Sequence, residues 1–186
     1  MLTKTKQTWL VAGIVLLALV LDQVSKVYIK THFQLGEARE VFSWFWIVFV
    51  ENNGMAFGIE WFSKLLLTLF RIVAVGVIGW YIHTLIHKQT VRTGYLATVA
   101  MVIAGALGNI IDCVCYGKIW GYADWFHGKV VDMLYFPLIR NAAGEVLFFR
   151  PVFNIADSFI TVAVLLIIIF YRKDLDASLA GVGKRK

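Results

Sequence analysis

Hydrophobic residues in this chain of 186 residues are gathered into long blocks. Four blocks of mostly apolar residues occupy about residues 8–27, 65–86, 94–111 and 152–171. A helix needs roughly 20 such residues to cross the hydrocarbon core of a bilayer, because each residue advances it by only about 1.5 Å. The pattern therefore predicts an α-helical membrane protein with four transmembrane helices, which its length suggests is a single membrane-embedded domain, residues 1–186.

Two long connections, about 28–64 and 112–151, carry patterns of their own. Residues 41–50 and 146–153 are aromatic and β-branched almost throughout, which is typical of short strands. Seven aromatic residues lie between Tyr116 and Phe136, and Tyr and Trp favour the headgroup layer of a membrane. We therefore expect a small extracytoplasmic β-sheet and an interfacial aromatic loop beside the helices.

Basic residues predict the orientation of the spans. Lys4 and Lys6 precede the first span, and Lys88 and Arg92 lie in the short connection between the second and third. The tail after the fourth span adds Arg172, Lys173, Lys184, Arg185 and Lys186. Positive charge is retained on the cytoplasmic side of membranes. Both termini are therefore predicted to be cytoplasmic, with the two long connections on the outer face.

Composition supports lipid as the solvent of this chain. Hydrophobic residues make up 60% of it and charged residues 16%, against about 45–50% and 25% in soluble domains. The net charge of +6 does not indicate nucleic-acid binding, because the basic residues form no continuous patch. Cys113 and Cys115 are too close in sequence for an unstrained disulfide, so we interpret them as small apolar residues at a helix end.

Ionisable residues at membrane depth are costly and therefore candidates for function. Asp22 and Lys26 are four residues apart, so they share a helix face and can pair. That pair is either a structural salt bridge or a direct part of a site. Asp157 follows Asn154, a natural N-cap, by three residues, so helix capping alone could explain both.

Asp132 is harder to explain by structure alone. It lies in an apolar run, residues 130–134, where a carboxylate loses its hydration without an obvious local partner. If Asp132 and Asp157 met, they would share one proton, since two close carboxylates do not both ionise easily. One could then deprotonate a water while the other protonates a scissile carbonyl. This hypothesis of peptide hydrolysis requires the two carboxylates to lie close together, which the sequence alone does not show.

Other catalytic schemes fit the residues less well. Ser25 and Lys26 could form a Ser–Lys pair, but adjacent helical residues point about 100° apart. His83 and His87 are four apart and could bind zinc, yet no carboxylate lies near them in the sequence. Neither a glycine-rich phosphate loop nor a nucleotide fingerprint is present. We therefore expect no metal and no cofactor.

A function without catalysis remains the main alternative. A small transporter or a lipid-binding assembly factor could use Asp22, Asp132 and Asp157 as a relay for protons or cations. The three acids lie near one interface, however, instead of lining a path across the bilayer. Peptide cleavage by the purified protein would separate the two functions.

Five short blocks along the chain resemble the lipoprotein signal peptidases (signal peptidase II). In chain order they are Asp22–Lys26 (DQVSK), Glu51–Gly58 (ENNGMAFG), Gly105–Asp112 (GALGNIID), Val130–Asp132 (VVD) and Phe153–Asp157 (FNIAD). Each block is weak by itself. Five in order, at these places in a four-span topology, are specific to that family.

The resemblance implies that Asp132 and Asp157 are the catalytic aspartates of an aspartic endopeptidase. It also implies a set of residues that line or support the substrate site, namely Asp22, Lys26, Asn53, Gly54, Asn109, Asp112, Asn154 and Ala156. A catalytically dead homologue is disfavoured because both aspartates are present.

The resemblance further implies the substrate and the location. The family acts on prolipoproteins whose cysteine carries a diacylglyceryl group and cleaves just before that cysteine, and globomycin, a cyclic peptide, inhibits it. We therefore expect an enzyme of the bacterial cytoplasmic (inner) membrane, with its active site at the outer face. Its expected partners are lipidated precursors, membrane lipids and globomycin-type inhibitors, and we expect a monomer.

Two features depart from the family pattern. Cys113 stands where the family usually has an arginine, and the stretch between Asp112 and Asp132 is longer than usual. The family arginine that would contact polar groups of the substrate is therefore missing at this position. Arg71 could supply a substitute charge or could simply extend its side chain to the interface. The aromatic stretch 116–125 could cover the site as a lid.

Overall fold

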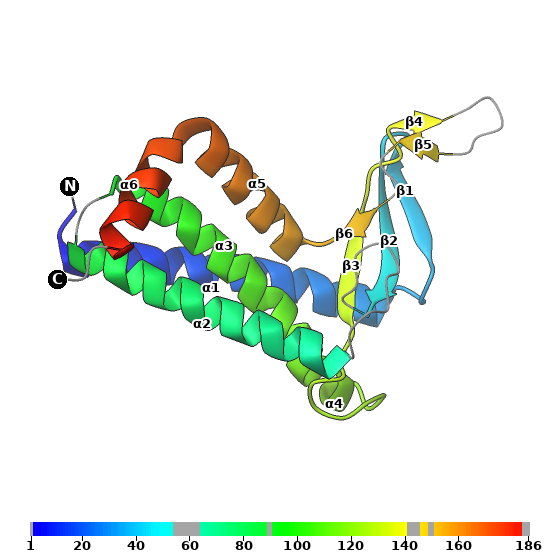
Figure 1. The fold of residues 1–186 in the computed structure, drawn as a ribbon. Coiled ribbons are helices and arrows are strands. Elements are labelled where there is room, and N and C mark those ends of the chain that lie inside the picture. The colour runs from blue at the N-terminus through cyan, green and yellow to red at the C-terminus, as the bar shows by residue number, and fades with distance from the viewer. Residues whose placement is uncertain (1, 54–63, 89–90, 141–145, 149–150, 184–186) are drawn as a thin grey trace. The chain divides into compact units, whose positions relative to one another are not determined.

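The computed structural model describes residues 2–53, 64–88, 91–140, 146–148 and 151–183 (Figure 1). The elements in chain order are α1 (Lys4–His32), β1 (Ala38–Phe42), β2 (Phe45–Asn52), α2 (Lys64–Lys88), α3 (Thr93–Ile111), the π-helix η1 (Asp112–Tyr116), α4 (Gly117–Ile119), β3 (Val130–Tyr135), β4 (Ile139–Arg140), β5 (Val146–Phe148), β6 (Val152–Phe153), α5 (Ile155–Phe170) and α6 (Arg172–Gly183).

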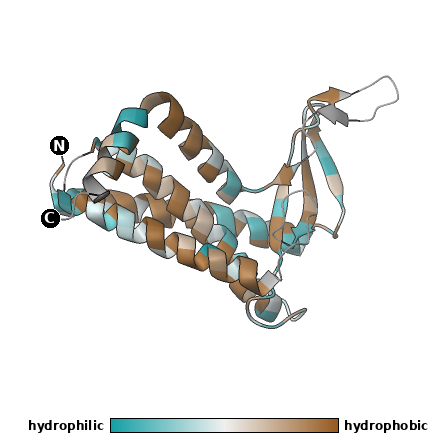
Figure 2. Cartoon of the chain, in the orientation of Figure 1, coloured by the Kyte–Doolittle hydropathy of each residue, from teal (hydrophilic) through white to brown (hydrophobic). Residues whose placement is uncertain are grey.

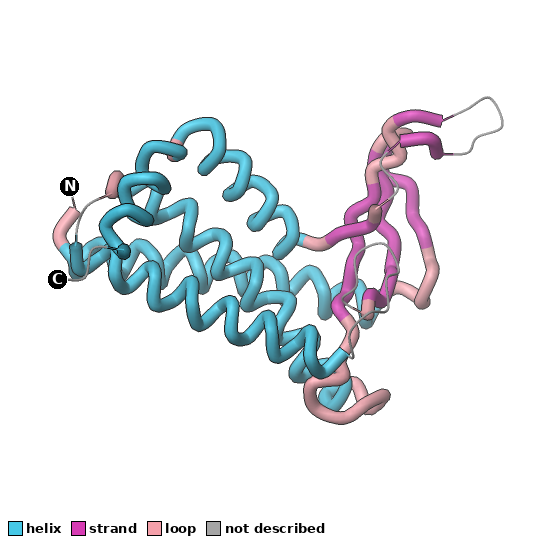
Figure 3. Tube along the Cα trace, viewed as in Figure 1, coloured by secondary structure: helices cyan, strands magenta, loops and turns pink. Residues whose placement is uncertain are grey.

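The chain divides into two compact units. The first consists of Met1–Val20, Leu69–Gly108 and Ala156–Lys186, and we call it the helical unit. The second consists of Leu21–Thr68 and Asn109–Ile155, and we call it the sheet unit because it holds every strand of the described chain. Figure 3 marks the helices and the strands along the chain.

Long apolar helices confirm the predicted fold class. In the described part of the chain, three helical segments are long and apolar enough to cross a membrane, namely Lys4–His32, Leu65–Lys88 and Thr93–Ile119. The 29 residues of α1 extend for about 43 Å, more than the roughly 30 Å hydrocarbon core requires. Figure 2 shows hydrophobic residues along much of α2, α3 and α5.

The fourth predicted span, residues 152–171, is shorter than expected. Val152 and Phe153 form β6, and α5 begins only at Ile155, directly after Asn154. The 16 residues of α5 bend by 87° into α6, so the pair counts as a fourth span only if it is taken as one bent segment. Their hydropathy predicts that Val152 and Phe153 belong to the helix, but the two residues pair with β3 instead.

Packing in the helical unit centres on α2 and α3. Its buried cluster consists of Ile82, Leu85, Ile86, Val91, Tyr95, Leu96 and Val99. The hydroxyls of Tyr81 and Tyr95 lie 2.7 Å apart, and Tyr81 also hydrogen-bonds Ser178 of α6. Arg92 forms an ion pair with Asp174 at 2.7 Å. These contacts fasten α6 to the connection between α2 and α3.

A four-stranded antiparallel sheet in the order β1-β2-β3-β6 forms the sheet unit's framework. The single strand predicted over residues 41–50 is wrong in one respect. Two turn residues, Ser43 and Trp44, split it into β1 and β2, and Phe42 pairs with Phe45 across the turn. An uninterrupted aromatic run conceals such a turn, because it contains none of the Gly, Pro or Asn residues that usually mark one.

The sequence reading missed β3 and merged β5 with β6. Residues 146–153 were predicted as one strand, but β5 pairs with β4 in a separate two-stranded sheet, whereas β6 pairs with β3. β3 lies between two neighbouring strands, and its first four residues are buried. A buried strand reads as a continuous apolar run, which periodicity alone does not distinguish from a helix.

The predicted aromatic loop is partly helical. The third helical segment continues past Ile111 through η1 and α4. Tyr116 is buried in a cluster with Ile29, Phe33, Phe49, Val131 and Met133, so it belongs to the core of the sheet unit and not to the interface. Trp125 is half exposed, as an interfacial residue would be. The lid role stays a prediction.

Candidate active site

Lys26 stands at the centre of a buried charged cluster in the sheet unit. Its Nζ lies 2.9 Å from Asp22 Oδ2 and 2.8 Å from Asp112 Oδ2, and it donates to Asn109 Oδ1 at 3.0 Å. An ammonium group has three donors, so these acceptors satisfy it fully. The side chain of Lys26 is wholly buried. The predicted Asp22–Lys26 pair is confirmed, but Asp112 is an equal partner.

Gln23 connects the two carboxylates of this cluster. Its Nε2 donates to Asp22 Oδ2 and to Asp112 Oδ1, both at 3.0 Å, and its Oε1 accepts a bond from the Tyr116 hydroxyl at 3.2 Å. Asp22 and Asp112 together carry one more negative charge than Lys26 neutralises if both are ionised. Two amide N–H donors from one side chain offset part of that excess.

The π-helix η1 brings Asp112 and the start of β3 together. Asp112 is its first residue and accepts the backbone N–H of Val131 at 3.2 Å. Gly128 lies against this turn and donates its N–H to the Cys113 carbonyl at 2.9 Å. A Cβ at Gly128 would fall 1.9 Å from the Asp112 carbonyl oxygen, so only glycine fits. Isolated π-helical turns are frequent at functional sites.

Asp132 is held by two amides inside the sheet unit. It lies on β3 and is 2% exposed. Its Oδ1 accepts Asn154 Nδ2 at 2.7 Å and its Oδ2 accepts Asn52 Nδ2 at 3.0 Å. Asp132 pairs with Val50 in the ladder, which places Asn52, two residues on, at the diagonal position on the same face. The hydrogen-bond partners of this carboxylate therefore lie at the end of β2 and directly after β6, and not beside Asp132 in the sequence.

Asn109 links the charged cluster to Asp132. Its Oδ1 accepts both Lys26 Nζ at 3.0 Å and Asn154 Nδ2 at 3.1 Å, and the same Asn154 nitrogen reaches Asp132. Asn154 itself is completely buried. One continuous hydrogen-bonded row therefore runs from Lys26 to Asp132. A row that is satisfied throughout is rigid and holds its members in fixed positions.

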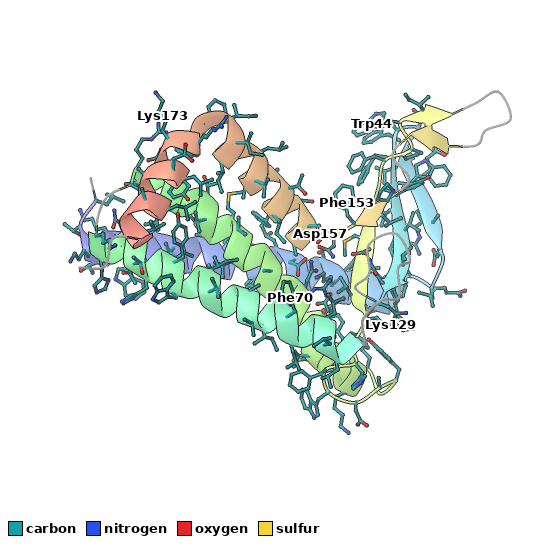
Figure 4. The ribbon with its side chains drawn as sticks, viewed as in Figure 1. Trp44, Phe70, Lys129, Phe153, Asp157 and Lys173 are labelled. Carbon is teal, nitrogen blue, oxygen red and sulfur yellow. The ribbon has the colours of Figure 1, made fainter. Side chains whose placement is uncertain are left out.

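Asp157, the second of the two predicted catalytic aspartates, lies in the helical unit on the first turn of α5 (Figure 4). Its neighbour Ala156 is completely buried. A Cβ at Gly105 of α3 would fall 2.3 Å from the Ala156 carbonyl oxygen. The backbones of α3 and α5 therefore approach closely at this point, which explains why both blocks carry a small residue here.

The predicted site residues thus divide into three sets. The sheet unit brings together Asp22, Lys26, Asn109, Asp112, Asp132 and Asn154, whereas Ala156 and Asp157 belong to the helical unit. Asn53 is exposed just after β2, and Gly54 lies outside the described residues. Sequence reasoning missed Asn52 and the bridging role of Gln23. Asn52 stands next to Asn53, and only the register of β2 distinguishes the two.

A second charged group anchors the segment 117–129 to β2. Glu51 pairs with Lys30 Nζ at 2.6 Å and with Lys129 Nζ at 3.1 Å. Lys30 also lies over the rings of Trp120 and Tyr122, 5.2 Å and 5.1 Å from their centroids. Such cation–π contacts add to the attachment. Glu51 therefore connects α1, β2 and the segment before β3. Figure 4 shows Lys129, which directly precedes β3.

Glu51 gives the attachment a dependence on pH. Burial raises the pKa of Glu51, but hydrogen bonds from Lys30 and Lys129 outweigh burial and hold that pKa below its ordinary value of 4.5. A lowered pKa means that the contribution of Glu51 to stability is present above pH 4.5 and is lost as the pH falls through the folded-state value.

We therefore expect Glu51→Gln to lower the free energy of unfolding by about 1–3 kcal/mol at pH 7. The difference from the wild type should shrink as the pH falls below 4.5 and through the lowered folded-state pKa of Glu51. Denaturant unfolding in detergent between pH 7 and pH 3 measures both quantities. Glu40→Gln, on the exposed strand β1, is the control and should have little effect. A difference that persists unchanged to pH 3 would contradict this role of Glu51.

Comparison with known proteins identifies the family. The profile of Signal peptidase (SPase) II matches residues 14–172. The lipoprotein signal peptidase of Porphyromonas gingivalis is 42% identical over 204 residues, covering 97% of this chain and 90% of its own length. The chain belongs to the signal peptidase II family. The corresponding protein of Amoebophilus asiaticus is 36% identical and covers 92% of this chain and 81% of its own length.

Solved structures of bacterial membrane enzymes are similar to this signal peptidase II. A bacterial membrane enzyme determined by the in meso method at 2.3 Å resolution superposes with a TM-score of 0.66 at 28% identity, covering 95% of this chain and 92% of that one. A second, at 1.9 Å, gives 0.62 at 29% identity, with 86% and 90% covered. The family cleaves the signal peptides of prolipoproteins, so this chain is a peptidase of the bacterial inner membrane.

Cys113 departs from the signal peptidase II pattern, and the structure shows how little space surrounds it. It is 1% exposed and sits in η1, close to Gly128. A guanidinium at this position would either be buried or displace the segment 117–129. Overpacking of this kind costs about 1–3 kcal/mol.

We expect Cys113→Arg to weaken binding of a globomycin-type inhibitor by about tenfold, with little change in the turnover of bound substrate. Cys113→Ala, which removes only the thiol, is the matched control and should keep the wild-type inhibition constant. Inhibition constants and kcat are measured for the three proteins. A large fall in kcat at unchanged inhibitor affinity would assign position 113 to catalysis or folding, and tighter binding would mean that the space is free.

Proposed function

We propose that this signal peptidase II removes the signal peptide from diacylglyceryl-modified prolipoproteins by an aspartyl mechanism, cleaving just before the lipidated cysteine. In this proposal Asp132 and Asp157 are the catalytic pair. The observation that carries it is the setting of Asp132, a buried carboxylate held by Asn52 and Asn154 at the end of a satisfied hydrogen-bonded row.

The chain connection supports Asp157 as the second member. Asp157 follows Asn154 by three residues, and Asn154 donates to Asp132 at 2.7 Å. Three residues span at most about 11 Å even when fully extended. The chain itself therefore limits how far Asp157 can lie from Asn154, the residue that donates to Asp132, and Asp157 occupies the first turn of α5, where negative charge is favoured.

The proposed chemistry needs only these two carboxylates and one water. Asp132 takes a proton from the water as its oxygen attacks the scissile carbonyl carbon, and Asp157 gives its proton to the carbonyl oxygen. The tetrahedral intermediate collapses when Asp132 passes its proton to the leaving amine, the C–N bond breaks, and Asp157 recovers its proton from the hydroxyl that becomes the new carbonyl group. Asn52 and Asn154 hold Asp132 in place, and the row from Lys26 holds Asn154.

We also infer that both termini face the cytoplasm and that the active site faces outward. Lys4 begins α1, Lys88 ends α2 and Arg172 begins α6, so basic residues mark helix ends throughout the helical unit. This distribution fits retention of positive charge on the cytoplasmic side. The strands of the sheet unit would then lie on the outer face, where lipidated precursors emerge.

Incubation of the purified protein with a diacylglyceryl-modified precursor tests the proposed function. Mass spectrometry should find a product that begins at the lipidated cysteine, and the same precursor without the lipid is the matched control. Cleavage should survive EDTA, because no group of three or more metal-ligating side chains occurs among the residues that the structure describes. Absence of cleavage would favour the relay function. Loss with EDTA and recovery with zinc would overturn the aspartyl mechanism.

A further inference from the structure

An apolar groove lies between α1 and α2 within the helical unit. Its volume is about 490 Å³, and its lining runs on α1 from Thr8 to Leu19 and on α2 from Gly79 to His87. Between the two ends its walls are aliphatic side chains, alanine and glycine. This volume falls in the range of about 300–1,000 Å³ that ligand sites occupy.

The dimensions of the groove match one leaflet of a bilayer. Eleven residues separate Thr8 from Leu19 on α1, so the groove is about 16 Å long at 1.5 Å per residue. Half of the hydrocarbon core is about 15 Å. The groove therefore runs from the end of the spans near the N-terminus to about the bilayer midplane.

The lining of the groove favours a hydrocarbon chain. Eight of its eleven lining residues are aliphatic side chains, alanine or glycine. A hydrocarbon chain is therefore the occupant that both the membrane and the aliphatic walls favour, because it meets apolar atoms along its length.

Polar side chains gather at one end of the groove only. The rings of His83 and His87 are exposed and stack with their centroids 4.0 Å apart, and both line the groove with Thr8. Lys88 follows His87 directly. Lys4 lies one helical turn before Thr8, and the Thr8 hydroxyl donates to the Lys4 carbonyl oxygen at 3.0 Å. These residues offer N–H donors and positive charge at headgroup depth.

Carboxylates are absent from the sequence around this end. Residues 1–21 and 64–111 contain no Asp or Glu. On α6, Asp174 is paired with Arg92 at 2.7 Å, and the exposed Asp176 is outnumbered by Arg172 and Lys173 of the same helix. The charge of this end of the groove is therefore complementary to an anionic headgroup.

We propose that this groove binds an anionic phospholipid of the leaflet at the N-terminal end of α1. One acyl chain lies along the groove beside Ala12, and the phosphate contacts Lys4, His83 and His87. The site lies away from the proposed catalytic residues in the sequence and is independent of the proposed function. It would hold a structural lipid on the enzyme.

Lipid retention by the purified enzyme tests this site. The protein is exchanged from detergent into mixed vesicles of phosphatidylglycerol and phosphatidylcholine with identical chains, then extracted gently and analysed by native mass spectrometry. The wild type should retain phosphatidylglycerol in preference to phosphatidylcholine. Ala12→Phe, which fills the groove, should weaken retention about tenfold, the equivalent of about 1.4 kcal/mol.

Matched variants distinguish a site from ordinary lipid contact. Leu17→Phe changes an exposed residue of α1 that does not line the groove, so it should retain lipid like the wild type. His83→Leu with His87→Leu should remove the preference for the anionic headgroup, whereas Lys173→Gln on α6 (Figure 4) should keep it. If Ala12→Phe does not fold, Gly79→Ala adds a methyl group at a residue that lines the groove, and this Cβ would make an ordinary contact of 3.7 Å with Ile103.

Two results would overturn the proposal. Equal retention by a groove-filling variant and by Leu17→Phe would mean that the groove holds no lipid. Equal retention of the two phospholipids by the wild type, or an unchanged preference in the double histidine variant, would mean that the polar end does not select an anionic headgroup.

Discussion

Replacing Asp132 or Asp157 with asparagine is expected to abolish cleavage of a lipidated precursor while the protein still folds and inserts. Asparagine keeps the shape of the side chain but neither takes a proton from water nor gives one to the carbonyl. Acid–base catalysis contributes typically about 10²–10⁴-fold to the rate. The fall should reach the detection limit, because the same carboxylates also position the water.

The two variants should differ in stability. In Asp132→Asn the new amide faces the amide donors of Asn52 and Asn154, so one donor loses its acceptor at about 1–3 kcal/mol. Asp157 is only half buried, and its variant should unfold like the wild type. Asp124→Asn, which changes a carboxylate that is 87% exposed, is the control for activity. Wild-type turnover by either catalytic variant would refute the aspartyl mechanism.

Removing the charge of Lys26 is expected to destabilise the protein more than removing the whole charged cluster. Lys26→Met leaves Asp22 and Asp112 buried without their shared cation, and an uncompensated buried charge costs about 3–5 kcal/mol. The sequence indicated one partner for Lys26. The structure adds a second, so neutralising Asp22 and Lys26 together should restore only part of the lost stability.

A series of variants measures this coupling. The free energy of unfolding in detergent should rise from Lys26→Met, through Lys26→Met with Asp22→Asn, to the triple variant that also carries Asp112→Asn. Lys6→Met changes an exposed lysine of the same helix and should alter stability by less than about 0.5 kcal/mol. Equal stabilities of the single and triple variants would show that the cluster is not energetically coupled.

The helices were predictable from the sequence because lipid imposes a simple rule. A run of about 20 apolar residues has few alternatives to a spanning helix, and α1, α2 and α3 follow it. The strands obey no such rule. β3 is a short apolar run whose identity depends on its neighbours β2 and β6, and these neighbours come from distant parts of the chain.

Contacts in the site were predictable where both residues lie on one helix or strand, because their spacing decides whether they can touch. Contacts between two different elements were not predictable. Asp22 and Lys26 share a helix face, so their pairing followed from their separation alone. Asn52 reaches Asp132 because of the β2–β3 register. The resemblance to signal peptidase II nominated the adjacent Asn53 instead. Gln23 contacts Asp112 and Tyr116 across 89 and 93 residues, a separation that no local pattern reveals.

The hydrogen-bonded row from Lys26 to Asp132 also has a direction. An ammonium group only donates, so Lys26 compels Asn109 to turn its oxygen toward it. That oxygen in turn demands the nitrogen of Asn154, and the same nitrogen faces Asp132. Rotating the Asn109 amide by half a turn would set donor against donor, and rotating the Asn154 amide would set acceptor against acceptor. A single buried cation therefore determines, two side chains away, that the carboxylate of Asp132 meets an N–H group and never a second oxygen.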